Sequence, residues 1–505
     1  MNKHIIQLLL IAILLTACGP AVLPPPPTAT ATQTIAPSQT PTSPPTQTAI
    51  PAITPRPTLQ TEGPYLLFTY DNKNFTIMDA DGSGQKQFQL PNDGYIWDLE
   101  KAVSPDGKWL VFFTGSTEEP YDLALNLFNL SDETALRVSN LIAPGFPTNL
   151  EPVTKTIWFT EYDTDCSNNP TCRLHTVEIS FREGIWRFDW SPDSQNIAFA
   201  AQIDGPSSDV YIYSIENRAI KRLTNELENI GLMISWAPNG EKILYTSSEP
   251  GTSYSYSYLH IADPKVNSIQ NPKSVEGGIF WRGAGWVNQN SYLILSGGEG
   301  APPHDFRLLN IDTQEITQIW RYTAESFFIN KINGTIFLLT FPGEISGLEP
   351  EPEQGLYLVE FDGKFKKLSN EIFTPLQEPG PRNTYFAVQI NASTNEYLPL
   401  IVIDSDGNVT HLPLQIWYSI PPRVSPNQKY VIIPSATGIG LYNENLEQIK
   451  LWDMKVSEII WRPDSLGIFL SASKELYYLS IPDGKPVQVN TCTLEFCLSK
   501  YAWLP

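Results

Sequence analysis

Three carboxylates alternate along one short stretch of the chain, and their spacing could bind a cation. Glu161, Asp163 and Asp165 are separated by single residues and directly precede Cys166. Ca²⁺ takes several oxygen ligands at once, so carboxylates repeated at this interval suit it. A chain with 54 Asp and Glu residues also brings carboxylates together by chance. The stretch is the best calcium candidate in the sequence, and no other cofactor is indicated.

The patterns typical of catalytic sites are missing from the sequence. It contains no Gly-x-Ser-x-Gly elbow, no His-Glu-x-x-His pair and no phosphate-binding loop. The histidines beyond the first residues are His175, His260, His304 and His411, each in a different part of the chain. We therefore name no catalytic residue and do not expect an enzyme.

The first 18 residues have the layout of an export signal. The apolar run from Ile5 to Leu15 is interrupted only by Gln7 and is too short to span a bilayer. Leu15-Thr16-Ala17-Cys18 follows, and this segment resembles the lipobox of bacterial lipoproteins. The resemblance implies that Cys18 carries the lipid. The protein would then contact the membrane through acyl chains and lie in the bacterial cell envelope, facing outside the cytoplasm. The alternative is an ordinary secretory signal.

Four more cysteines form two close pairs, Cys166 with Cys172 and Cys492 with Cys497. An even number of cysteines in an exported chain favours two local disulfides. Metal binding is the alternative, but only His175 is near either pair, so no confident metal site is predicted.

Residues 19–62 are predicted to be a disordered tether. The segment is rich in Pro and Thr, has four consecutive prolines at 24–27 and contains almost no charge. Such a composition cannot bury enough apolar area to offset the entropy of the chain. As an extended polyproline-like segment it would reach on the order of 130 Å.

A turn motif recurs from residue 63 to the end of the chain. Pro followed by Asp or Asn and then Gly or Ser suits a tight turn, and an apolar β-rich run follows each copy. The clearest turns lie at residues 104–107, 191–194, 237–240, 425–427 and 462–465. Weaker copies keep only the run, as in residues 156–160 and 335–340.

Third and fourth runs complete a unit of four short strands, repeated about every 40–45 residues. This is typical of a β-propeller blade, and helical periodicity is nearly absent. The Ser-Pro-Asp-Gly turn at 104–107 and the segment Met78-Asp79-Ala80-Asp81-Gly82 resemble the TolB-type, WD40-like (PD40) repeat. We expect an all-β protein with about ten four-stranded, blade-like units over residues 63–505.

The two ends of this region complement each other. Residues 501–505 have the pattern of a first strand ending at its turn, whereas residues 63–68 have that of a second strand without a first. Pairing of these N- and C-terminal strands would close the propeller and remove its open edges. Ten units form either one unusually large ring or two smaller propellers, and the usual limit on ring size favours two.

Two further patterns concern the surface and the core. The predicted loops between second and third strands, and between blades, carry more acidic than basic residues, which would suit a cationic partner or divalent ions. Trp190, Trp236, Trp286 and Trp461 recur just before the turns. We interpret them as packing residues between blades and not as a surface for stacking sugars.

Charge and fold together limit the function. The net charge of -21 argues against nucleic-acid binding. The expected function is a lipid-anchored extracytoplasmic binding or scaffolding module for a protein, a peptide or a glycan. The alternatives are a propeller hydrolase or lyase that acts on extracellular polysaccharide, and a sensory or assembly component of an envelope complex. Fold alone does not choose among them.

Overall fold

The computed structural model divides the chain into two units, residues 1–54 and residues 55–505. It describes most of residues 58–505, and the rest of this section concerns those residues. The gaps fall at 116–122, 142–152, 159–173, 180–186, 204–207, 226–228, 249–256, 297–304, 331–333, 341–352, 371–373, 389–397, 417–419 and 493–496, and at 202, 271, 281, 323, 325, 382–383, 436 and 499.

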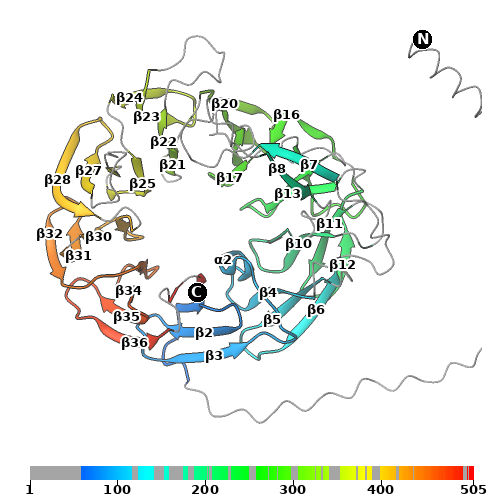
Figure 1. Cartoon of the computed structure of the whole chain (residues 1–505). Helices are drawn as coiled ribbons and strands as arrows, with labels where there is room; N and C mark the ends of the chain where they lie inside the picture. The colour runs from blue at the N-terminus through cyan, green and yellow to red at the C-terminus, as the bar shows by residue number, and fades with distance from the viewer. Residues whose placement is uncertain are drawn as a thin grey trace, which may run out of the picture. The chain divides into compact units, whose positions relative to one another are not determined.

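The second unit is a β-propeller with nine blades arranged in one ring (Figure 1). From the innermost to the outermost strand, blade 1 contains β37 (Lys500–Leu504), β1 (Tyr65–Thr69), β2 (Asn74–Asp79) and β3 (Gln85–Gln89); blade 2 contains β4 (Trp109–Thr114), β5 (Ala124–Asn129) and β6 (Ala135–Asn140); blade 3 contains β9 (Phe188–Trp190), β10 (Asn196–Ala201), β11 (Asp209–Ser214) and β12 (Ala219–Arg222).

The next three blades follow the same order. Blade 4 contains β13 (Asn229–Trp236), β14 (Ile243–Ser248), β15 (Ser257–Ala262) and β16 (Ser274–Phe280); blade 5 contains β17 (Arg282–Trp286), β18 (Ser291–Ser296), β19 (Asp305–Asn310) and β20 (Ile316–Trp320); blade 6 contains β21 (Ser326–Asn330), β22 (Thr335–Thr340), β23 (Gly355–Glu360) and β24 (Phe365–Ser369).

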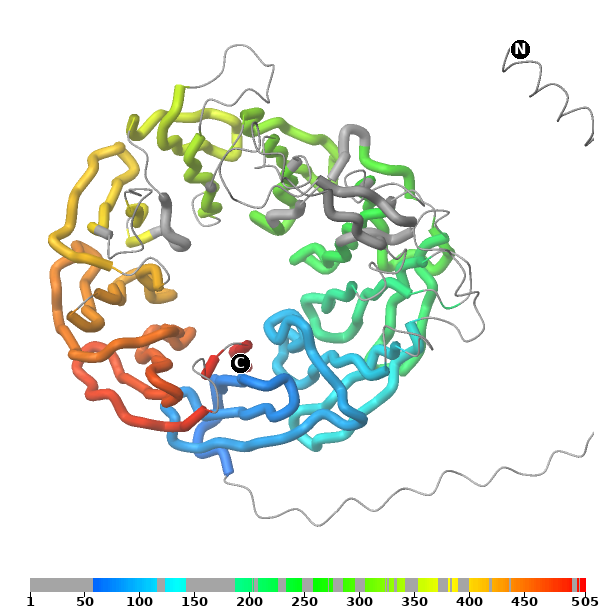
Figure 2. Tube along the Cα trace, in the orientation of Figure 1, coloured from blue at the N-terminus to red at the C-terminus, as the bar shows by residue number. Residues whose placement is uncertain are grey.

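The last three blades return the chain to its start, as the colours in Figure 2 show. Blade 7 contains β25 (Thr374–Pro379), β26 (Tyr385–Val388), β27 (Leu398–Ile403) and β28 (Val409–Ile416); blade 8 contains β29 (Arg423–Val424), β30 (Tyr430–Ser435), β31 (Gly438–Asn443) and β32 (Gln448–Trp452); blade 9 contains β33 (Glu458–Trp461), β34 (Gly467–Ala472), β35 (Glu475–Ser480) and β36 (Val487–Thr491).

The propeller predicted from the sequence is confirmed, and its blades number nine instead of about ten. The difference lies between blades 2 and 3, where β7 (Val153–Trp158) and β8 (Leu174–Ile179) pair only with each other. This hairpin has the apolar run of a blade strand, so it counts as a unit in the sequence. All nine blades belong to one ring, so the preference for two smaller propellers, which relied on the usual limit on ring size, is wrong.

Pairing of the two ends of the propeller is also confirmed. β1 pairs antiparallel with β37 in a register that places Tyr65 opposite Leu504 and Thr69 opposite Lys500. Ala502 and Leu504 are buried in a core shared with blades 2 and 3. Blade 1 is therefore completed by the last strand of the chain.

The recurring turn is stabilised by a serine whose hydroxyl makes one hydrogen bond within the turn and one to the strand that follows it. The hydroxyl of Ser104 donates to Asp106 Oδ1 at 2.7 Å and accepts from the backbone N–H of Trp109 at 2.9 Å. Ser191 repeats these contacts with Asp193 and Asn196, and Ser425 repeats them with Asn427 and Tyr430. The side chains thus satisfy backbone donors where the strand ladder stops.

Blades pack face to face, so the hydrophobic core lies in layers between them. One core joins Leu67 of blade 1, Phe112 of blade 2 and Phe199 of blade 3, all almost fully buried. Another joins Leu293 of blade 5 with Ile336 of blade 6. The period-two alternation of each strand therefore buries apolar side chains on both of its faces.

Lysines on the outermost strands tie neighbouring blades together. Each donates through Nζ to a backbone carbonyl at the turn of the following blade. The pairs are Lys86 with Leu130, Lys221 with Pro264 and Val266, Lys366 with Asp406, and Lys450 with Asp483 and Gly484. These hydrogen bonds join the outermost strand of one blade to the following blade.

The chain enters the propeller against blade 1. The carboxylate of Asp79 is fully buried and accepts from the backbone N–H of Gln60 at 2.7 Å and from the hydroxyl of Thr61 at 2.7 Å. Leu59 packs on the core of the first three blades. Residues 59–61, at the end of the predicted tether, therefore contact the first blade.

Candidate functional site

The innermost part of blade 2 departs from the regular pattern. Tyr95 pairs with Phe113 and Val103 pairs with Leu110, both as isolated bridges. Residues 96–102 lie between Tyr95 and Val103, whereas only two residues of β4 separate their partners Phe113 and Leu110. Residues 96–102 therefore cannot all pair with β4. They form the inner bulge, which contains the short helix α2 (Leu99–Ala102) and lies on the inner side of the ring (Figure 1).

Local sequence explains why the bulge turns into a helix. The side chain of Asp98 accepts from the backbone N–H of Lys101 at 3.2 Å and so caps the first turn. Leu99 and Ala102 are buried, whereas Glu100 and Lys101 are exposed.

None of the helices in the described part of the chain is long and apolar enough to cross a membrane.

The bulge is fixed to the strand that closes the ring. Lys500 of β37 donates through Nζ to the backbone carbonyl of Ile96 at 2.8 Å. Burial lowers the pKa of this ammonium group, and the nearby Asp98 carboxylate opposes that effect. Both ends of the bulge are therefore held by neighbouring strands.

An exposed tryptophan projects from this rigid support. The side chain of Trp97 is 43% exposed. Its ring centroid lies 4.7 Å from that of Phe113 and 5.4 Å from that of Tyr95. Phe113 in turn lies 5.9 Å from Phe188 of blade 3. Rings from two blades thus support a large aromatic surface in contact with water.

A half-buried carboxylate lies where blades 3 and 4 meet, within electrostatic reach of the bulge. Asp189 accepts from the backbone N–H of Trp236 at 2.6 Å and from that of Trp190 at 3.1 Å. Desolvation raises the pKa of Asp189 to about 6, although these hydrogen bonds and the charge of Lys101 act in the opposite direction.

The recurring tryptophans bridge blades, as the sequence predicts. The indole N–H of Trp190 donates to the carbonyl of Ala102 at 3.1 Å, and that of Trp461 donates to the carbonyl of Arg423 at 3.0 Å. Trp286 reaches the hydroxyl of Ser235 at 2.9 Å. Trp236 is buried, but its indole N–H has no partner among the described residues.

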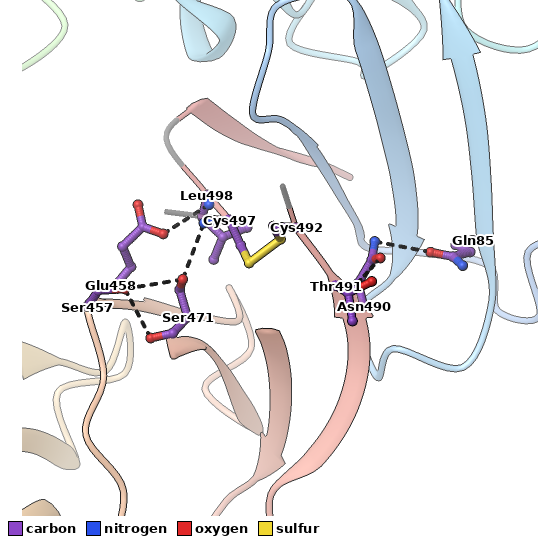
Figure 3. Close-up of a disulfide and its surroundings, with 9 residues drawn as sticks. All are labelled: Gln85, Ser457, Glu458, Ser471, Asn490, Thr491, Cys492, Cys497 and Leu498. Carbon is purple, nitrogen blue, oxygen red and sulfur yellow. Dashed lines mark hydrogen bonds between the residues drawn. A yellow bond between two sulfur atoms is a disulfide. The ribbon is translucent and has the colours of Figure 1, made fainter. Parts of the chain in front are cut away.

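Cys492 and Cys497 form a disulfide in the connection from blade 9 to the closing strand (Figure 3). The backbone N–H of Leu498 donates to Glu458 Oε2 at 2.9 Å, and that of Cys497 donates to the hydroxyl of Ser471 at 3.2 Å. Burial raises the pKa of Glu458. The disulfide therefore lies in a connection that side chains of blade 9 also hold.

Most of the other predicted site residues lie outside the described residues. These are the lipidation candidate Cys18, the pair Cys166 and Cys172, and the calcium candidates Glu161, Asp163 and Asp165. Among the residues that the structure does describe, no group of three or more His, Cys, Asp or Glu side chains is placed to hold a metal.

The acidic loops are described only in part. Glu353 pairs with Lys367 at 2.8 Å, and the Asp71 carboxylate accepts from the backbone N–H groups of Lys73 and Asn74 at 2.9 and 2.7 Å. These acidic groups therefore make local contacts within their own blades.

One histidine has the geometry of a general base. His260 Nε2 lies 2.8 Å from the hydroxyl of Ser247, and Nδ1 lies 3.0 Å from the carbonyl of Pro272. Because the carbonyl only accepts, Nδ1 carries the proton and Nε2 accepts from Ser247. Both side chains are buried and His260 stacks on Tyr245, so a substrate has no access. The pair supports the core of blade 4.

The inner bulge is the feature that sequence reasoning missed. Its signal was an Asp followed by Leu-Glu-Lys-Ala at 98–102, which is a capping residue before good helix formers. The aromatic role of Trp97 depends on Phe113, which is distant in sequence.

Comparisons with known proteins give only distant similarities. No family model and no curated protein matches the chain. Among solved structures, it is similar to TolB from Acinetobacter baumannii, with 16% identity over 60% of this chain and 62% of that one and a TM-score of 0.31. It is also similar to a eukaryotic initiation factor, with 12% identity over 88% and 98% of the two chains and a TM-score of 0.47. An oligogalacturonate lyase in complex with manganese gives 10% identity over 83% and 97% of the two chains, with a TM-score of 0.34.

Proposed function

We propose that this protein is a binding module held at the surface of a bacterial membrane by a lipid on Cys18. The propeller would lie outside the cytoplasm at the end of the proline-rich tether. Its partner would be an envelope protein, a peptide or a glycan, and not a nucleic acid. One observation carries the binding function, namely the exposed Trp97 on a bulge that interrupts an otherwise regular blade.

The physical reason is that an exposed aromatic ring on a rigid support can pack against a ligand without first being ordered. Trp97 is supported from below by Phe113 and Tyr95, so its ring is held in place before a ligand arrives. A site that is organised in advance loses less conformational entropy on binding. Blades 1, 2 and 3 all contribute to this support.

Capture from envelope extract tests the binding function. The full chain in mild detergent serves as bait, and the Trp97→Ala variant is compared with Phe365→Ala, whose aromatic side chain is 54% exposed on the outermost strand of blade 6. We expect Trp97→Ala alone to lose the captured component. Equal capture by both variants and the unmodified chain would exclude the inner bulge as the binding site.

The same preparation separates binding from catalysis. Incubation with extracellular polysaccharides, followed by measurement of reducing ends and of unsaturated products, detects a hydrolase or a lyase. Turnover by the full chain would favour the enzymatic alternative, whereas capture without turnover supports a binding module.

Lipid attachment is tested separately. Growth of the producing bacterium with labelled fatty acid should label the unmodified chain but not the Cys18→Ser variant. Equal labelling of the two chains would contradict the anchor.

A further inference from the structure

We propose that residues 58–61 form a strap that Asp79 fastens to blade 1, and that this strap protects the closing strand pair β1–β37. It would protect the pair from proteases and from unfolding that begins in the preceding segment. This role goes beyond the binding function assigned to Trp97 and does not depend on it.

One buried carboxylate fastens the strap. Asp79 accepts from the backbone N–H of Gln60 at 2.7 Å, from that of Thr61 at 3.2 Å and from the hydroxyl of Thr61 at 2.7 Å. Hydrogen bonds to an ionised group are stronger than bonds between neutral groups. Because the Asp79 side chain is fully buried, loss of these donors would leave a charge without compensation. The strap is therefore costly to detach.

Asp79 differs from the residues that occupy the same place in other blades, where the third strand turns into the fourth. In blade 7, the carboxylate of Asp404 accepts from the backbone N–H groups of Asp406 and Asn408, both at 2.9 Å. Within residues 80–84 of the turn that follows Asp79, only the hydroxyl of Ser83 donates to it, at 3.3 Å. The side chains that bind their own turn as Asp404 does are Asn129, Asn310 and Asn443. Blade 1 thus uses a common turn residue to hold a separate segment.

Gly84 gives the strap room to approach this turn. A Cβ atom at residue 84 would lie 2.8 Å from the backbone oxygen of Thr58 and 3.0 Å from the backbone nitrogen of Gln60, and it would also meet the Asp79 carboxylate. A larger residue would therefore displace the strap. The close fit and the hydrogen bonds involve the same turn.

The strap lies where the closing strand pair begins. Tyr65 is the first residue of β1, and it pairs with Asp79 of β2 on one side and with Leu504 of β37 on the other. Its hydroxyl donates to the carbonyl of Thr61 at 2.6 Å. Leu59 packs on the core to which Leu504 belongs. Unfolding or cleavage that advances along the chain from its N-terminal side must detach the strap before it reaches β1.

Limited proteolysis of the full chain tests the strap. Thermolysin cleaves before leucine, so a cut between Thr58 and Leu59 requires the strap to open, and its rate follows the population of the open form. Asp79→Asn keeps the shape of the side chain but sets an amide N–H₂ group against the donors of the strap. We expect the cut before Leu59, identified by N-terminal sequencing, to become about tenfold faster or more.

Two further variants make the result decisive. Asp404→Asn changes the matching residue of blade 7 and should leave the cut before Leu59 unchanged. Thr61→Val removes only the hydroxyl group that donates to Asp79, so it should accelerate the cut by a smaller factor. If Asp79→Asn does not fold, the rate for Thr61→Val alone decides. Rates equal to that of the unmodified chain in every folded strap variant, or an equal acceleration in Asp404→Asn, would overturn the strap.

Hydrogen exchange tests the protection of the ring closure. Asp79→Asn should accelerate amide exchange in β1 and β37 about twofold or more, and should leave β22 of blade 6 unchanged. Faster cleavage before Leu59 without faster exchange in β1 and β37 would overturn the protective role. An equal acceleration in β22 would also overturn it, because the variant would then have lost stability throughout the ring.

Discussion

Single hydrogen bonds from indole nitrogens decide how firmly the inner ends of the blades are joined. Trp190 and Trp461 each place an N–H group against a carbonyl of the preceding blade. Trp236 occupies the same position in its blade but lacks such a partner among the described residues. The chain thus contains both the contact and its natural control.

Replacement of these tryptophans by phenylalanine should separate packing from hydrogen bonding. Trp461→Phe removes the hydrogen bond from the indole N–H to the carbonyl of Arg423, at a cost of about 1–3 kcal/mol. Trp236→Phe loses a similar apolar area but no such bond, so its cost should be smaller by about that amount. Urea unfolding followed by circular dichroism measures both, and equal losses of stability would contradict the role of the hydrogen bond.

Asp189 should make the protein less stable as pH rises from about 4 to about 6. Its folded pKa of about 6 lies above the usual value for aspartate, so the folded state binds the proton more tightly than the unfolded state does. Above pH 6 the folded protein therefore carries a penalty on the order of 3 kcal/mol. Asp189→Asn should raise the thermal midpoint at pH 7.5, and its effect should vanish near pH 4.

The exposed Asp453 provides the control for this pH profile. Asp453→Asn should leave the midpoint unchanged over the whole range. A stabilisation by Asp189→Asn that is the same at pH 4 and pH 7.5 would show that titration of Asp189 is not its cause.

At the residue scale, the sequence predicted those contacts that join residues close together in the chain. The Ser-Pro-Asp turn was readable because Ser104 binds Asp106 and Trp109, which are close in sequence. The recurring tryptophans were placed correctly between blades. The raised pKa of Asp189 was not predictable, because it results from desolvation, which depends on how distant parts of the chain pack around this carboxyl group.

Prediction of whole strands and helices from the sequence is limited in the same way, because their partners are distant in the chain. Residues 156–160 have the apolar run of a blade strand in the sequence, yet β7 pairs only with β8. Pairing partners are set by long-range geometry, so a repeat count cannot distinguish a hairpin from a blade. The inner bulge was missed for the opposite reason, because a short helix took the place of an expected strand.

The connection between β36 and β37 should depend on its disulfide. The loop that Cys492 and Cys497 close is short, so the loss of the crosslink should cost about 2 kcal/mol. Glu458 and Ser471 also hold this connection, so Cys492→Ala with Cys497→Ala should still fold. Thermal unfolding with and without reductant measures the effect.

The double cysteine variant also supplies the control for reductant. Its midpoint should not respond to added reductant, apart from any contribution of the remaining cysteines. An unmodified chain whose midpoint equals that of the variant would contradict a stabilising role for this crosslink.

The ring is closed by pairing of the two complementary ends of the propeller, and the sequence predicted this pairing. A first strand without a second at residues 501–505 and a second strand without a first at residues 63–68 predicted the pairing of β1 with β37. The number of blades in the ring could not be predicted from the sequence. It depends on the angle between neighbouring blades, which arises from the packing of side chains such as Leu293 and Ile336 across each junction.

Removal of residues 500–505 should open this ring. The truncation exposes the backbone edge of β1 and the core that Ala502 and Leu504 cover. Loss of two buried apolar side chains costs several kcal/mol, and an open strand edge promotes pairing with other chains. We expect the thermal midpoint to fall by several degrees and self-association to appear in analytical ultracentrifugation.

Tyr501→Ala, which trims a 41% exposed side chain but keeps the strand, should remain monomeric and close to native stability. A truncated chain with an unchanged midpoint and no self-association would mean that blade 1 is stable without its innermost strand, and that the pairing of the two ends contributes little to the stability of the propeller.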